Sequence, residues 1–176
     1  MKICRKLNLI FVFVSIFLSG CILQSRQLTY LTELINDPPM DLSENSWSVS
    51  YSDYESVVYA VSTSAGILFS NKAGDQVLFD GWVVREAKGM GRYQLNMEIN
   101  DVGNARNFKR ENRIVLQQSC GRWENKKKLR VVLFSQYCDQ MVGDSNNILV
   151  NEANDIILIR QIVDEKYTVL TLTKLK

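Results

Sequence analysis

Large apolar residues alternate with serines in the stretch WSVSY, residues 47–51, and this alternation decides the fold class. Successive side chains of a β-strand point to opposite faces, so the pattern predicts a strand with one buried and one wet face. The same rhythm returns at residues 93–99, where Tyr, Leu, Met and Ile alternate with polar partners. Both stretches therefore predict strands of a sheet that is covered on one side.

Further β-branched or aromatic runs surround these two stretches, with turn signals between them and no long helical pattern. The runs cover residues 57–61, 66–70, 76–79, 82–87, 113–118, 129–137, 148–150, 156–162 and 167–175. Residues 71–75 and Asp80-Gly81 read as turns, and residues 103–112 as a polar loop. Strand signals that recur at this spacing predict an all-β antiparallel domain, either a β-sandwich or a strongly curved partial barrel.

Two aromatic residues fall on the predicted strands, Trp82 and Tyr93. We expect them to be core residues or cross-strand partners, with sugar-binding platforms as the alternative.

The N-terminus has the pattern of a bacterial lipoprotein signal peptide. Three basic residues precede a ten-residue apolar run at 9–18, which is too short to span a bilayer of roughly 30 Å. Leu18-Ser19-Gly20-Cys21 resembles a lipobox, which implies removal of residues 1–20 and attachment of acyl chains such as palmitate to Cys21. A plain secretory signal with a chance cysteine is the alternative.

The predicted organisation has three parts: a signal peptide over residues 1–20, a tether with a short helix over 21–45, and a β domain over 46–176. Leucines and an isoleucine at helical spacing between residues 24 and 36 favour the helix, and a flexible tether is the alternative. Because Ile22 rather than Asp follows the cysteine, sorting rules of enteric-type bacteria place the anchor in the outer membrane, with the domain in the periplasm. The anchor itself makes the membrane a partner.

Composition excludes several kinds of chemistry. The chain of 176 residues contains no histidine, so neither a Ser-His-Asp triad nor a histidine-ligated zinc can form. Without residues 1–20 the basic and acidic residues number 18 and 19, which argues against a nucleic-acid partner. No nucleophile, phosphate-loop or dinucleotide motif occurs, so we predict no enzyme activity and no cofactor.

A metal site is not predicted either. Asp139, Asp144 and Asn146 suggest a calcium loop, but Ile148 stands where an oxygen ligand is needed. The other carboxylates are too scattered to nominate a catalytic pair.

Cys120 and Cys138 are the even pair that remains if Cys21 carries lipid and the leader with Cys4 is removed. In an oxidising periplasm such a pair predicts a disulfide. A redox-active pair is the alternative, but it usually has Cys-x-x-Cys spacing, which is absent.

Basic residues are concentrated between Arg106 and Arg130, where nine stand against two acids. Cations beside an aromatic ring can bind anionic sugars or phosphates. A solvated hairpin whose lysines discourage edge pairing is the alternative. The candidate surface for an anionic glycan or a protein partner consists of Lys109, Arg110, Arg113, Arg122, Trp123, Lys126, Lys127, Lys128 and Arg130.

Two stretches resemble the YjbF-type lipoproteins of capsule and exopolysaccharide operons. Residues 79–90 are similar to that family's glycine turn and apolar strand, and residues 147–161 to its late hairpin, which ends in a strand carrying Gln. Leu149 stands where the family has Trp, and Asn154-Asp155 where it has Thr-Gly. The resemblance implies an all-β periplasmic domain, an outer-membrane anchor and an accessory role in polysaccharide secretion, and supplies no catalytic residue.

We therefore expect a non-enzymatic outer-membrane lipoprotein that serves polysaccharide export through protein or glycan contacts. A carrier or chaperone of lipid or lipidated cargo is a rival, and it requires an open apolar cavity. A sugar-active enzyme requires two convergent carboxylates, and a structural subunit of an envelope machine requires an exposed apolar patch.

Overall fold

The computed structural model describes residues 45–139 and 145–175. The described residues belong to one compact unit, the β domain. The predicted signal peptide, Cys21, the tether helix and Asp144 lie outside the described residues.

Thirteen strands and one short 3-10 helix, η1, make up the described part of the chain. The strands are β1 (Ser46–Tyr51), β2 (Tyr54–Thr63), β3 (Gly66–Ser70), β4 (Gln76–Phe79), β5 (Val84–Gly89), β6 (Leu95–Val102), β7 (Ala105–Arg110), β8 (Arg113–Ser119), β9 (Glu124–Lys128), β10 (Val131–Gln136), β11 (Asn146–Asn151), β12 (Ile156–Ile162) and β13 (Val169–Lys174), and η1 is Gly91–Tyr93.

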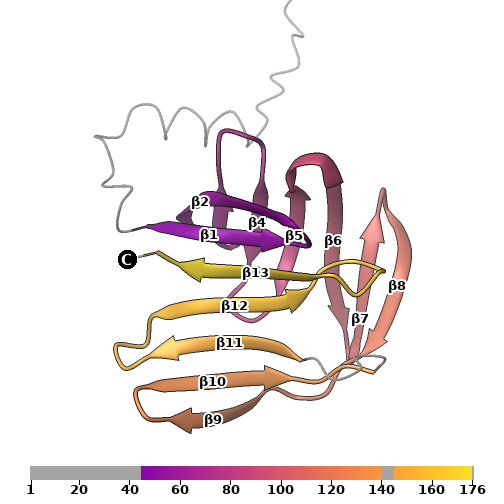
Figure 1. Ribbon diagram of the computed structural model, residues 1–176. Coiled ribbons are helices and arrows are strands. Elements are labelled where there is room, and N and C mark those ends of the chain that lie inside the picture. The colour runs from indigo at the N-terminus through magenta and orange to yellow at the C-terminus, as the bar shows by residue number, and fades with distance from the viewer. Residues whose placement is uncertain (1–44, 140–144, 176) are drawn as a thin grey trace, which may run out of the picture. The chain divides into compact units, whose positions relative to one another are not determined.

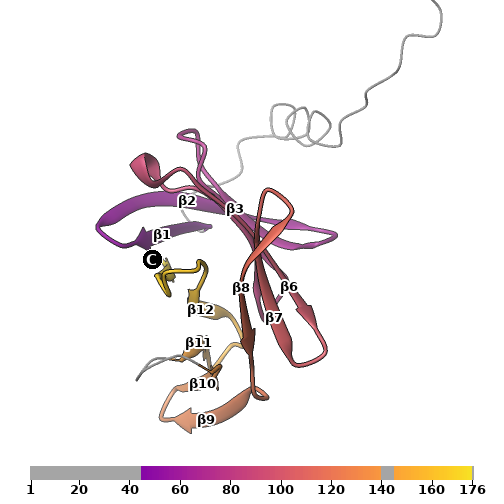
Figure 2. The same ribbon diagram turned by 90° about the vertical axis from the view of Figure 1, so that its right-hand side faces the viewer.

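All thirteen strands form a single antiparallel sheet in the order β8-β7-β6-β5-β4-β3-β2-β1-β13-β12-β11-β10-β9. The sheet curls into a half-barrel: β5–β8 stand upright in Figure 1 while β9–β13 lie across them, and Figure 2 shows the same curl from the side. The all-β antiparallel prediction is confirmed, and of its two forms the curved partial barrel is the one observed.

The inward residues of the curled sheet form the core. Trp47, Val49 and Tyr51 of β1 are buried, as their alternation predicts, and the Trp47 ring meets Phe69 edge-on at 5.0 Å between centroids. Leu95, Met97 and Ile99 of β6 are buried in the same alternating way. The apolar faces of the strands thus lie on the concave side. Because the sheet curls, the inward side chains of strands far apart in the sheet order pack against one another there.

The prediction of a polar loop over residues 103–112 is wrong, because these residues contain β7. Phe108 and the charged Arg106 both point inward and are buried, and Arg106 pairs with Asp101 on β6 at 2.9 Å. A buried arginine that is matched by an acid on the next strand does not give the apolar alternation by which a strand is recognised. The edge strand β9 was not predicted either. All of its residues are exposed and most are charged, so it also lacks the apolar alternation.

Asp75 joins two turns at the margin of the core. It is buried and accepts hydrogen bonds from the Tyr54 hydroxyl at 2.7 Å, the Asn71 amide at 2.7 Å and the Met90 backbone N–H at 2.7 Å. Burial raises its pKa, but these hydrogen bonds outweigh burial and hold the pKa below its usual range. Gly89 packs against this turn with a φ of +84°, and a Cβ there would stand 2.7 Å from the Gly74 carbonyl oxygen.

Tyr51 and Asp164 form a second buried polar contact, in which the Tyr51 hydroxyl donates to the Asp164 carboxylate. The other Asp164 oxygen accepts the backbone N–H groups of Lys166 and Thr168, which shapes the β12–β13 turn. Burial first, and then the Asp164 carboxylate, raise the pKa of Tyr51 to about 12.

This shift predicts a loss of stability at high pH. The protonated tyrosine is the form that the fold stabilises, so the contribution is full below the unfolded pKa of about 10 and disappears as pH rises toward 12. We expect the free energy of unfolding to fall by about 2 kcal/mol more in the native chain than in Tyr51→Phe between pH 9.5 and about 11.5. Urea unfolding at several pH values measures it, and parallel curves for the two proteins would contradict the assignment.

Candidate functional site

The turn between β4 and β5 crosses the concave side of the sheet and is fastened to β12 by Gln161. The Gln161 side-chain Oε1 accepts the Val84 backbone N–H at 3.0 Å, and its Nε2 donates to the Trp82 carbonyl at 2.7 Å. Gln161 is 1% exposed; its bond to Val84 is buried and its bond to Trp82 is partly buried. One side chain of β12 therefore holds a turn that is nearly eighty residues away in the chain.

Asp80 gives the same turn its shape. One of its carboxylate oxygens accepts the backbone N–H groups of Trp82 and Val83, both at 2.8 Å, and the other binds the Arg85 guanidinium at 2.5 Å. Burial raises the pKa of Asp80, but the two backbone bonds and Arg85 lower it further, so its pKa is below the usual range. The turn is thus held by Asp80, which belongs to it, and by Gln161, which bonds to it from strand β12.

Trp82 projects from this turn and leads a cluster of three aromatic rings. Its ring lies 5.6 Å from Trp123, in the segment before β9, and 5.4 Å from Phe134 on β10, edge-on to the latter. Trp82 is nevertheless 47% exposed. The prediction of Trp82 as a strand residue, in the core or as a cross-strand partner, is therefore wrong: β5 begins at Val84, and the Asp80 turn leaves the indole half-exposed.

Tyr93 also differs from its prediction, since it lies in η1 rather than on a strand and is partly exposed. Its ring meets Tyr51 edge-on at 5.2 Å, and its hydroxyl donates to Asp53. It takes no part in the aromatic cluster around Trp82.

A shallow open groove of about 230 Å³ lies beside Trp82, and we call it the Trp82 groove. Its volume exceeds that of an engineered cavity of about 150 Å³ that holds benzene, but it is below the roughly 300 Å³ at which sites for drug-sized ligands begin. The groove contains no titratable side chain and suits a short apolar segment or the apolar face of one ring. Its lining residues are Gly81, Trp82, Val132, Phe134, Ile148, Val150, Asn154 and Ile156.

A second, more polar hollow of about 300 Å³ continues from the Trp82 groove and shares Asn154 and Ile156 with it. It reaches Trp47 and Ala60 on the concave side, and Lys174 and Asp155 are the charged residues of its lining.

The fold divides the residues of the predicted basic surface between two separate edges of the sheet. They therefore do not form one continuous surface. Lys109, Arg110 and Arg113 flank the β7–β8 turn at one edge of the sheet, where Arg110 pairs with Glu165 at 2.9 Å. The rest, from Arg122 to Arg130, belongs to β9 and its flanks at the other edge. Trp123 alone of the predicted set enters the aromatic cluster.

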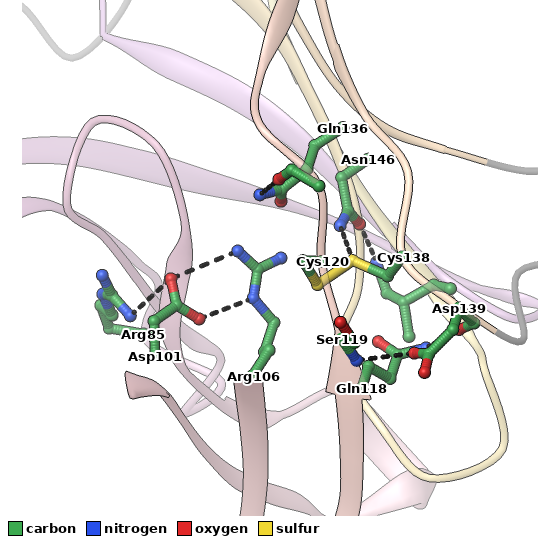
Figure 3. The surroundings of a disulfide bond; sticks show 12 residues. Arg85, Asp101, Arg106, Gln118, Ser119, Cys120, Gln136, Cys138, Asp139 and Asn146 are labelled. Carbon is green, nitrogen blue, oxygen red and sulfur yellow. Dashed lines mark hydrogen bonds and ion pairs between the residues drawn. A yellow bond between two sulfur atoms is a disulfide. The ribbon is translucent and has the colours of Figure 1, made fainter. Parts of the chain in front are cut away.

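Cys120 and Cys138 lie at disulfide-bonding distance, with 2.08 Å between their sulfur atoms. They also form an isolated antiparallel bridge, which Gly121 and Asp139 extend by backbone hydrogen bonds of 2.8 and 2.9 Å to Tyr137 and Ser119. The bridge connects the end of edge strand β8 to the end of β10, beside the other edge strand. The pair, shown in Figure 3, thus ties edge strand β8 to β10, the neighbour of the other edge strand β9.

Buried polar side chains surround this bridge. Figure 3 shows Arg106 with Asp101 on one side and the amides of Gln136 and Asn146 on the other. The Gln136 amide donates to the Gly121 carbonyl at 2.9 Å, and Asn146 accepts the Ile162 backbone N–H at 3.1 Å. These contacts position strands, and no group of three or more Cys, Asp or Glu residues in the described part could hold a metal ion.

Comparison with protein-family models, curated proteins and solved structures finds no match to this chain. The resemblance to the YjbF-type lipoproteins therefore stays a prediction. Within residues 45–139 and 145–175, no helix has the length and apolar character needed to cross a membrane.

Most of the groove residues were not predicted from the sequence. Val132 and Phe134 lie in a run, VVLF, that is apolar on both faces, so alternation does not reveal which face lines a groove. Gln161 was noted as part of the family resemblance, but its contact with the Trp82 turn needed the fold.

Proposed function

We propose that this chain is a non-enzymatic outer-membrane lipoprotein with an accessory role in capsule or exopolysaccharide secretion, and that it binds its ligand in the Trp82 groove. The observation that carries the proposal is the exposed Trp82 ring, which stands over an apolar groove. The groove is built where the two stretches that resemble the YjbF family meet, since Gln161 of one stretch holds Trp82 of the other.

The chemistry of the groove suits binding rather than catalysis. An exposed indole beside Phe134 offers a flat surface for the C–H face of a sugar ring or for a methylene chain. Lys127 pairs with Val132 in the β9–β10 register and so stands on the groove side of β9. A ligand with an apolar part in the groove could place an anionic group near this lysine.

A carrier of lipid or lipidated cargo is the second candidate, and the apolar lining of the Trp82 groove favours it. Burial of each methylene group contributes about 0.8 kcal/mol, so the affinity for an acyl chain should rise with the length of chain that the groove covers. The two candidates differ in whether the apolar part belongs to a sugar or to an acyl chain.

Ligand titration of the full-length protein in nanodiscs tests both candidates. The probes are a dansylated eleven-carbon fatty acid, read by energy transfer from tryptophan, and an acidic oligosaccharide, read by tryptophan emission, each corrected for empty nanodiscs. We expect saturable binding of one of them, and Trp82→Ala should weaken it at least tenfold. Ile114→Ala, which changes an exposed residue of β8, is the matched control.

Each outcome of this titration is decisive. Saturable sugar binding that depends on Trp82 supports the export role, and acyl binding that depends on Trp82 supports the carrier. Binding of neither probe, or equal losses in Trp82→Ala and Ile114→Ala, would remove the groove as a ligand site. Mass spectrometry of the native protein tests the anchor separately, because it detects acyl chains on Cys21.

A further inference from the structure

The tip of the β9–β10 hairpin carries an apolar residue that the fold does not use. Leu129 is 98% exposed, and its φ is +44°. Positive φ is uncommon for leucine and is adopted more readily by Gly or Asn. Neither burial nor backbone preference therefore explains a leucine at this tip.

Four cations adjoin Leu129 in the sequence: Lys126, Lys127 and Lys128 on β9, where they alternate between the two faces of the strand, and Arg130 in the turn. Within the described residues none of the four has an ion pair or a side-chain hydrogen bond. Protection of the sheet edge accounts for lysines on β9. Protection of the edge does not account for a fully exposed leucine, because an exposed apolar side chain favours association with other molecules.

The tip lies at the end of the strands where the chain enters the β domain. The strand register connects the two places: Trp47 at the start of β1 pairs with Lys174, and Val131 at the start of β10 pairs with Asn151 at the end of β11. Figure 1 shows the start of β1 and the β9–β10 turn on the same side. Asn154, which borders the Trp82 groove, belongs to the neighbouring β11–β12 turn on this side.

We propose that the β9–β10 tip docks on an anionic phospholipid surface, with Leu129 inserted at the headgroup boundary and the four cations bound to headgroups. A single apolar residue flanked by cations has the chemistry of an interfacial contact, in which the apolar side chain enters the headgroup boundary and each cation is attracted to the anionic bilayer. This inference rests on the proposed membrane anchor, and it implies that the end of the Trp82 groove bordered by Asn154 lies near the bilayer.

Quenching by brominated lipid tests the contact in the full-length protein reconstituted in vesicles. Leu129→Trp places an indole at the tip, and its fluorescence is compared with that of the parent protein in ordinary and chain-brominated phosphatidylglycerol vesicles. We expect the added indole to lose at least half of its emission in the brominated vesicles. Reversal of Lys126, Lys127 and Lys128 to Glu should abolish this loss.

Ile114→Trp is the matched control, because Ile114 is 56% exposed beside Arg110 and Arg113 at the β7–β8 turn. Equal quenching at both positions, absence of quenching at 129, or the same quenching in purely zwitterionic brominated vesicles would overturn the proposal. Only protein that mass spectrometry shows to be acylated at Cys21 is reconstituted, so failure of the anchor is recognised before the quenching experiment, which then tests the docking of the tip alone. Mass spectrometry of Cys21 therefore tests the anchor independently.

A second measurement avoids any difficulty in folding the Trp variant. Acylation of surface amines should be at least threefold slower at Lys126–Lys128 in anionic than in zwitterionic vesicles, with exposed Lys72 in the β3–β4 turn as the internal reference. Leu129→Asn suits the positive φ and should keep the thermal midpoint, yet it should remove most of this protection. Protection unchanged in Leu129→Asn would exclude insertion of the leucine.

Discussion

Gln161→Met is expected to lower the free energy of unfolding by about 3 kcal/mol, although methionine has nearly the same volume as glutamine. The substitution leaves the buried Val84 N–H without an acceptor and the Trp82 carbonyl without its donor. Each unsatisfied buried group costs about 1–3 kcal/mol. Denaturant unfolding measures the loss, and the exposure of Trp82 should change with it.

Gln117→Met is the matched control for this prediction. Gln117 also lies on a strand and donates a side-chain hydrogen bond, to Asn107 at 2.8 Å, but it is exposed on edge strand β8. Gln117 is exposed and, within the described residues, donates only this one bond, to a partner that is itself buried, so we expect a smaller loss of about 1 kcal/mol. Equal losses in the two variants would mean that Gln161 does not hold the Trp82 turn.

Loss of the Cys120–Cys138 bond is expected to destabilise the β domain by about 3 kcal/mol. The bond closes a loop with a sequence separation of 18, and the chain-entropy relation gives about 3 kcal/mol for a loop of this length. The bond also joins edge strand β8 to β10, the neighbour of edge strand β9, so its loss should loosen β9 and β10 and move Trp123 relative to Trp82. The double variant Cys120→Ala/Cys138→Ala tests both effects by unfolding and by tryptophan emission.

Chemical reduction of the native chain provides the control, since it should reproduce both effects without a change of sequence. A loss below about 1 kcal/mol in both experiments would contradict this assignment. In that case the backbone bonds of Gly121 and Asp139 would hold β8 and β10 together without the covalent bond.

Local patterns in the sequence were sufficient for most strands. The limits of β3, β4 and β12 coincide with the predicted runs, because each is a short apolar segment between turn residues. The pattern failed at β7, where the inward position is taken by Arg106, and at β9, which has no buried residue at all. Periodicity reports burial on one face, so it cannot identify a strand whose inward residue is charged or whose two faces are both wet.

The candidate site was predicted only in fragments. Trp123 and the lysines of β9 were selected for their charge and aromatic character, while Trp82 was assigned to the core. The turn chemistry of Asp80 was recognised, but the hydrogen bonds by which Asp80 turns Trp82 outward are visible only in three dimensions. The rest of the groove comes from strands whose sequences are apolar on both faces, such as β10.

The sequence by itself determined that this protein is built of antiparallel strands, because the alternation of side chains along one strand is a local property of the chain. It also predicted that Cys120 pairs with Cys138, on the expectation that Cys21 carries lipid and Cys4 leaves with the leader. Only the tertiary structure decided that the sheet curls into a half-barrel, that β8 and β9 become its edges, and that Gln161 meets Trp82. These features depend on the summed twist of thirteen strands and on contacts between residues almost eighty positions apart, which no local pattern encodes.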